Sequence, residues 1–181
     1  MIWTCPPKPC SGVTLIELLT VIVIVATLLA VGTSSFKSVS NSNRVTAEIN
    51  GLLGDLQYAR GEAIKEGQTV TVCVSTTGSS CTGGTSWNGG WLVFADANGN
   101  RVVDAGEAIL RVQNPFTSTD ALTTNNNVTA FTFNREGYAV GVVAGTLVTL
   151  HDATVKSTWT RCLSVSMVGL MAVQLYGGAC T

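Results

Sequence analysis

The feature that most constrains this chain is an uninterrupted apolar segment near its N-terminus. Residues Leu18 to Val31 read LLTVIVIVATLLAV and include no charged side chain. As a helix, the stretch from Val13 to Val31 would be about 28 Å long, close to the ~30 Å hydrocarbon thickness of a bilayer. A strand of a parallel sheet is too short to explain it, and a signal peptide has a shorter apolar core followed by a small-residue cleavage site. The segment therefore predicts a membrane-spanning helix.

An acidic side chain, Glu17, lies at the start of this segment. A carboxylate carried to the centre of a bilayer costs about 2.5–3.5 kcal/mol, so a plain anchor has no reason to keep one. An acid in the first helical turn interacts well with the helix dipole, but this does not explain an acid followed by a long uncharged stretch. We therefore expect Glu17 to find a positive partner when subunits assemble. Lys8, in the acid-free head before the segment, favours a cytoplasmic N-terminus.

A second helical stretch, over residues 43–65, continues the first. Its apolar residues recur at the helical period of 3.6, which predicts one buried face: Val45, Ile49, Leu52, Leu53, Leu56, Ala59, Ala63 and Ile64. Gly51, Gly54 and Gly61 weaken such a helix by up to ~1 kcal/mol each. Close packing against a sheet and a helix that can be stretched are both explanations for them. Gly67 is a good C-terminal stop.

From residue 69 onward the pattern is that of β-strands separated by turn clusters. The predicted strands are Thr69–Ser75, Gly90–Ala95, Ala108–Val112, Val128–Asn134, Thr146–Leu150, Cys162–Ser166 and Ala172–Tyr176. The predicted fold class is therefore α+β, a long N-terminal helix packed on antiparallel sheets. Residues 117–127, TSTDALTTNNN, are expected to form a mobile loop.

The charge composition and the motifs exclude several classes of protein. Only 12% of the residues are charged, and the net charge is −1, which argues against a disordered chain and against nucleic-acid binding through bulk charge. The single histidine, His151, has no catalytic partner in the sequence, and no GxSxG, HExxH or P-loop pattern is present. We therefore expect no enzymatic activity.

The N-terminal segment resembles the type IV prepilin family over Gly12-Val13-Thr14-Leu15-Ile16-Glu17-Leu18-Leu19. The resemblance implies that prepilin peptidase cleaves between Gly12 and Val13 and N-methylates Val13, although phenylalanine is commoner at that position. Glu17 is then the fifth mature residue, where the family places its glutamate. The new amine of Val13 could pair with Glu17 of a neighbouring subunit, because an unpaired buried charge is costly. This organisation predicts a leader peptide (1–12), a transmembrane helix (13–35), its continuation (36–67) and a globular β domain (68–181).

The middle of the chain resembles the GspH/FimT group of minor pilins and pseudopilins. The matching stretches are LQYARGEAIK, VTVC and WLVFAD, followed by a Gly-Glu step at residues 106–107. The resemblance implies a pilin fold and a structural subunit near the tip of a type IV pilus or a type II secretion pseudopilus. It also implies a single-pass protein of the bacterial inner membrane with a periplasmic domain. The implied partners are other pilins or pseudopilins, prepilin peptidase and the inner-membrane assembly platform.

Four of the six cysteines follow the apolar segment, on the side where disulfides can form. They allow three connectivities, of which we predict the local pairs Cys73–Cys81 and Cys162–Cys180. A zinc site is the alternative, but the chain has no CxxC spacing and only one histidine.

One loop, residues 96–107, has the ligand spacing of a calcium-binding EF-hand loop. Its candidate ligands are Asp96, Asn98, Asn100, Asp104 and Glu107. The sixth place, which needs glycine for the sharp turn, holds Arg101, and the flanking segments are strands. The alternative is a long hairpin turn in which these side chains bond their own backbone.

DNA binding, as by a tip pilin for natural transformation, is the alternative function. DNA-binding members of the group carry a GRxR-like stretch near the C-terminus. The matching segment here, residues 165–172, has Leu170 and Ala172 at the arginine places, so the guanidiniums that would grip phosphate are missing. DNA binding is therefore not expected.

Overall fold

The computed structural model describes residues 12–175, apart from the side chains of residues 31–35. Its single α-helix, α1, runs from Leu15 to Glu66. The chain divides into two compact units, residues 1–40 and residues 41–181. The helix crosses the boundary between these two units.

The first unit consists of the beginning of α1. The Thr14 hydroxyl accepts a hydrogen bond from the Glu17 amide (3.3 Å), and the Thr14 carbonyl accepts one from the Leu18 amide (3.1 Å). Thr14 therefore caps the helix, in the Thr-x-x-Glu arrangement of a capping box. Among the described residues, no helix combines the length and the apolarity needed to cross a membrane. The membrane span over residues 13–35 stays a prediction.

The second part of α1 buries one face, as the 3.6-residue pattern predicts. The six core residues on it are fully buried: Val45, Ile49, Leu52, Leu56, Ala59 and Ala63. Leu53 is partly buried against this core, whereas Ile64 is 50% exposed. The helix ends at Glu66, and Gly67 follows it in the left-handed region (φ +65°), where glycine is favoured.

The helix glycines do not pack closely against either sheet. A Cβ atom added at Gly51, Gly54 or Gly61 would meet no heavy atom within 4 Å. The explanation that close packing within the chain requires them is therefore wrong, since the helix leaves room for a side chain at each position.

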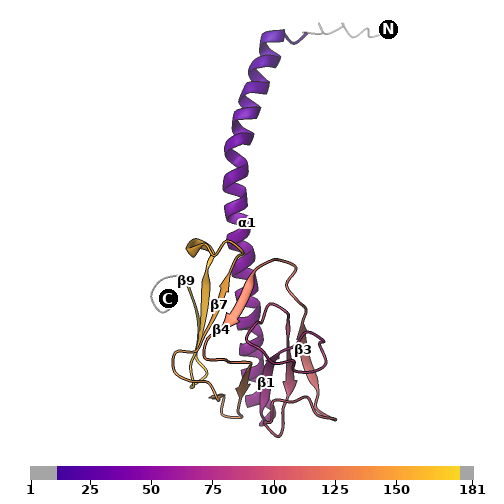
Figure 1. Cartoon of the computed structure of the whole chain (residues 1–181). Coiled ribbons are helices and arrows are strands. Elements are labelled where there is room, and N and C mark those ends of the chain that lie inside the picture. Colours follow the sequence, from indigo (N-terminus) through magenta and orange to yellow (C-terminus); the bar gives the residue numbers. More distant parts are fainter. Residues whose placement is uncertain (1–11, 176–181) are drawn as a thin grey trace, which may run out of the picture. The chain divides into compact units, whose positions relative to one another are not determined.

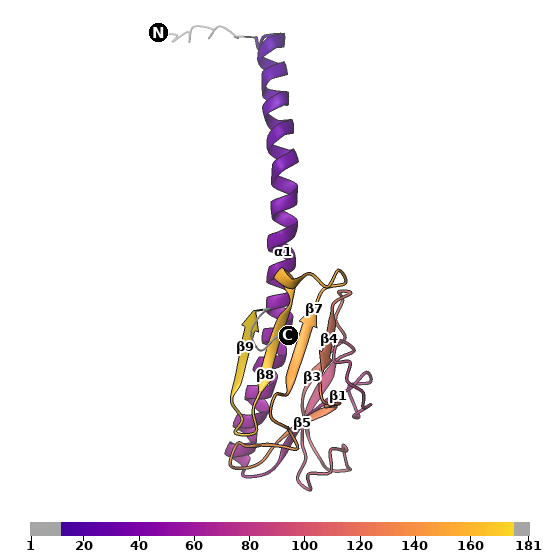
Figure 2. The same ribbon diagram turned by 60° about the vertical axis from the view of Figure 1, so that its left-hand side comes forward.

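The strands form two antiparallel sheets (Figures 1 and 2). The first has the order β3-β2-β1-β5-β6, with bounds Ile109–Gln113, Trp91–Ala95, Val70–Val74, Ala130–Phe133 and Ala139–Val140. The second has the order β4-β7-β8-β9, with bounds Ala121–Thr124, Leu147–His151, Arg161–Val165 and Met171–Leu175. A short 3-10 helix, η1, spans Ser157–Trp159.

The seven predicted strands are all present, but β4 and β6 were not predicted. The expectation of a mobile loop over residues 117–127 is wrong, because β4 lies within it and pairs with β7. On the other side of β4, the Trp87 amide donates to the Leu122 carbonyl (2.7 Å). Only Leu122 of this strand is fully buried, so its sequence lacks the apolar alternation by which a strand is predicted.

The main core lies between the buried face of α1 and the two sheets. A smaller apolar cluster forms on the first sheet from Cys73, Leu92, Phe94 and Ala130, with Cys81 and Val103 packed against it. Two loops therefore contribute to this second cluster: the loop that contains Cys81 and the loop 96–107.

Candidate assembly and processing site

The predicted processing site lies directly before α1. Gly12 and Val13 precede the first helical residue, and neither is helical. No heavy atom lies within 4 Å of a Cβ added at Gly12, and Val13 is 70% exposed. The peptide bond between them is thus accessible in this unit, as a peptidase substrate must be.

Glu17 occupies the first turn of α1 and is exposed. Its amide is taken by the Thr14 cap, but its carboxylate forms no hydrogen bond or ion pair with any residue that the structure describes. Sequence reasoning missed the cap, although the Thr-x-x-Glu spacing is a known signal for one. Glu17 therefore has both a capping position and a carboxylate available to another molecule.

Apolar side chains cover the beginning of α1 on every side. The large ones are 48–82% exposed: Leu15, Ile16, Leu18, Leu19, Val21, Ile22, Val23, Ile24, Val25, Leu28 and Leu29. Exposed apolar surface that surrounds a helix needs another apolar environment to cover it, such as a bilayer or neighbouring helices.

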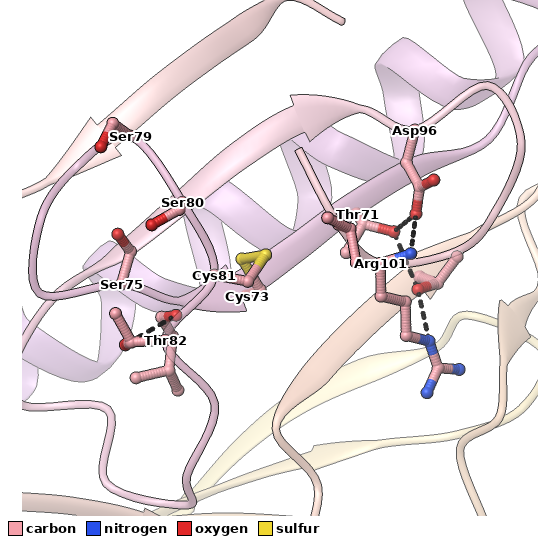
Figure 3. Close-up of a disulfide and its surroundings, with 12 residues drawn as sticks. Thr71, Cys73, Ser75, Ser79, Ser80, Cys81, Thr82, Asp96 and Arg101 are labelled. Atoms are coloured by element: carbon pink, nitrogen blue, oxygen red, sulfur yellow. Dashed lines mark hydrogen bonds between the residues drawn. A yellow bond between two sulfur atoms is a disulfide. The ribbon is translucent and has the colours of Figure 1, made fainter. Parts of the chain in front are cut away.

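The first predicted disulfide, Cys73–Cys81, is confirmed (Figure 3), with a Cα–Cα distance of 5.6 Å. It ties the loop after β1 back onto that strand, and both cysteines belong to the smaller apolar cluster. For the second pair, Cys162 lies buried in β8, whereas Cys180 falls outside the described residues. The pairing Cys162–Cys180 stays a prediction.

The loop 96–107 is organised around the carboxylate of Asp96, which is completely buried. This carboxylate accepts hydrogen bonds from the Thr71 hydroxyl (2.6 Å), the Asn100 amide (3.0 Å) and the Arg101 amide (3.1 Å). Figure 3 shows Asp96 and Arg101 beside Thr71 of β1. Arg101 adopts the left-handed conformation (φ +64°) at the place where an EF-hand has glycine.

The other candidate calcium ligands also bond within the loop. The Asp104 carboxylate accepts the side-chain amides of Asn98 and Asn100, each at 2.8 Å. The Glu107 carboxylate accepts the amides of Ala97 and Asp104, each at 3.0 Å. No group of three or more His, Cys, Asp or Glu side chains in the described part of the chain is arranged to hold a metal ion. These contacts favour the hairpin-turn interpretation.

Residues 165–172, where DNA-binding members of the group have arginines, comprise the end of β8, the turn after it and the start of β9. Leu170 on this turn is 67% exposed. The nearby Arg161 is only 8% exposed and donates to the carbonyls of Thr158 and Thr160, each at 3.0 Å. Arg161 is therefore committed to the backbone and is not available to a phosphate.

A helix whose buried face packs on antiparallel sheets, after an apolar and exposed beginning, defines a pilin-type α+β fold. Comparisons with known families agree. The model of the family described as "Type II transport protein GspH" matches residues 48–169, and that of the "Prokaryotic N-terminal methylation motif" matches residues 7–33. The chain therefore belongs to the GspH family, which is a family of structural pilins rather than of enzymes.

Among solved structures, the chain is similar to the type IV minor pilin FimU of Pseudomonas aeruginosa. One crystal form has 21% sequence identity and a TM-score of 0.55, over 73% of this chain and 89% of that chain. A second form gives a TM-score of 0.49 over 75% and 90% of the two chains. The first likeness supports the fold. No curated protein sequence matches the chain.

Proposed function

We propose that the chain is a minor pilin or pseudopilin, a structural subunit near the tip of a type IV pilus or a type II secretion pseudopilus. Prepilin peptidase removes residues 1–12 and methylates Val13. Residues 13–35 then anchor the protein in the bacterial inner membrane with the globular domain in the periplasm. The assembly platform joins the mature subunit to other pilins or pseudopilins.

The observation that carries this proposal is the exposed apolar beginning of α1, with one acid at its start. None of the described residues of the same unit packs over this apolar surface. A bilayer covers it before assembly, and the helices of neighbouring subunits cover it afterwards.

In this mechanism, cleavage creates a positive amine at Val13, and Glu17 of a neighbouring subunit supplies the negative charge. In an apolar environment an unpaired charge is strongly unfavourable, so only the register that pairs the two charges is stable. The accessible Gly12–Val13 bond and the free Glu17 carboxylate are both compatible with these steps.

Two substitutions at one position test the role of the Glu17 charge. The cap uses the backbone amide of Glu17 and the Thr14 hydroxyl, so it is kept in both variants. Glu17→Gln removes only the charge, whereas Glu17→Ala removes the whole polar group. We expect both variants to be processed and inserted in the membrane, and both to be missing from sheared filaments on immunoblots. Mass spectrometry of the N-terminal peptide checks processing through the methylated Val13.

The matched control is Glu66→Gln, which neutralises an exposed acid at the other end of the same helix and should assemble normally. Normal assembly of Glu17→Gln would contradict charge pairing. A mature protein trimmed beyond residue 35 and released as a soluble species would overturn the proposed function as a whole.

A further inference from the structure

A pair of acidic side chains joins α1 to the segment between β3 and β4, within the second unit. Glu48 of α1 accepts a hydrogen bond from the Ser118 hydroxyl at its Oε1 atom (2.8 Å). Its other oxygen, Oε2, is buried and is the only such side-chain atom in the described residues without a hydrogen-bond partner. A buried acceptor without a donor is costly, unless the carboxyl group itself carries a proton.

The second acid, Asp120, is buried and has a guanidinium as its partner. Arg44 of α1 donates to both carboxylate oxygens of Asp120, from Nε (2.8 Å) and from Nη2 (2.9 Å). The Asp120 amide also donates to the Ser118 hydroxyl (3.3 Å), which brings the two acids to the same serine. One arginine thus lies beside two carboxyl groups, and its bidentate contact is with Asp120.

The surroundings of Glu48 disfavour its charge. The pKa of Glu48 is raised to about 7, mainly by burial and in addition by the neighbouring Asp120. The Ser118 hydrogen bond and the charge of Arg44 lower this pKa but do not outweigh burial. The bidentate contact of Arg44 supplies a positive partner for the Asp120 carboxylate.

The second sheet and the residue directly after β7 also bring charged groups to this cluster. Asp152, directly after β7, interacts with Arg44, and its pKa is lowered by the Thr154 hydroxyl and by backbone amides despite its burial. Arg161 of β8 donates to Ser42 and to backbone carbonyls. His151 lies opposite Ala121 in the β4–β7 ladder.

We propose that Glu48 and Asp120 share one proton, and that this carboxyl pair makes the attachment of residues 114–120 to α1 dependent on pH. The protonated Glu48 carboxyl donates a hydrogen bond to the Asp120 carboxylate, and this bond holds residues 114–120 against α1. When the segment opens above the ordinary pKa of a glutamate, this proton passes to water, and Glu48 becomes an ordinary solvated carboxylate.

The direction of the pH dependence follows from the two states. The closed state keeps the proton up to about pH 7, whereas the open state loses it at the usual glutamate pKa of ~4.3. The closed state is therefore most favoured at low pH, loses stability as the pH rises between these two values, and loses little more above pH 8.

The segment that this pair fastens covers part of the aromatic core. Phe116 packs edge-on against Trp91, with ring centroids 6.0 Å apart. Beside them lies a hollow of about 430 Å³ between α1 and the segment, and Glu48 forms part of its wall. Opening the segment would expose Trp91 and Phe116, so the carboxyl pair controls access to this apolar surface.

Hydrogen exchange of the full chain in detergent, at pH 5 to 8, tests the proposal. After correction for intrinsic exchange rates, protection of the amides in residues 114–120 should fall by roughly tenfold or more between pH 5 and pH 7 and then level off. Glu48→Gln cannot lose a proton, so its protection should be independent of pH. Glu62→Gln, a neutralised acid on the same helix, should behave as the wild type.

Persistence of the fall in protection in Glu48→Gln would overturn the proposal, because this variant retains His151 and Asp152. A second measurement does not depend on any variant: the carboxyl carbon resonance of Glu48 should titrate near pH 7. Titration near the ordinary glutamate value would equally overturn it. Neither result would affect the proposed assembly function, which rests on Glu17.

Discussion

The two parts of α1 differ completely in how their apolar side chains are covered. In the first part, residues 15–30, every residue is exposed. In the second part, Leu52 and Leu56 are fully buried against the sheets. One continuous helix thus has a part that its own chain stabilises and a part that needs another molecule.

Helical periodicity, rather than hydrophobicity, therefore identifies the part of α1 that packs within the chain. An apolar stripe at a period of 3.6 needs one partner surface, which the sheets supply. A helix that is apolar all round needs covering on all sides, which a single globular domain cannot provide.

The largest effect is expected from a leucine-to-alanine change in the buried part. Leu52→Ala should lower the free energy of unfolding of the globular unit by about 2–5 kcal/mol, because it leaves a cavity in the core. The matched change in the exposed part, Leu19→Ala, should leave that free energy unchanged. Urea unfolding of the full chain in detergent, followed by tryptophan fluorescence, measures both. A comparable loss in Leu19→Ala would contradict the division between the two parts.

A smaller effect of opposite sign is expected at the helix glycines. Gly54→Ala should stabilise the globular unit by about 0.5–1 kcal/mol, because alanine is a better helix former and the added methyl group meets no neighbour. Gly67→Ala serves as the control and should destabilise it, because residue 67 has a positive φ. If Gly54→Ala destabilised the unit, an unrecognised close contact would explain the glycine.

No effect is expected from calcium. The oxygen atoms of Asp96, Asp104 and Glu107 already accept hydrogen bonds from the loop, so the loop does not need a cation to hold its shape. Millimolar calcium should leave the melting temperature unchanged, as differential scanning calorimetry would show. A calcium-dependent rise that disappears in Asp96→Ala would instead favour the EF-hand interpretation.

Short-range signals predicted most of the architecture. The period of 3.6 identified the buried face of α1, and runs of β-branched and aromatic residues identified seven of the strands. The pair Cys73–Cys81 could be predicted because its short separation limits the alternatives. The spacing of Gly12, Val13 and Glu17 gave the candidate processing and assembly site, which is a property of adjacent residues and needs no tertiary contact.

Contacts between groups distant in the chain could not be predicted from the sequence. Strand β4 exists because β7 and Trp87 supply hydrogen-bond partners on its two sides, whereas its own sequence resembles a loop. How the helix packs on the sheets likewise decides that space is left beside Gly54 and that Glu48 lies next to Asp120. Sequence patterns report local conformation and the need for burial, but which partner satisfies a buried polar group is decided only when the chain folds.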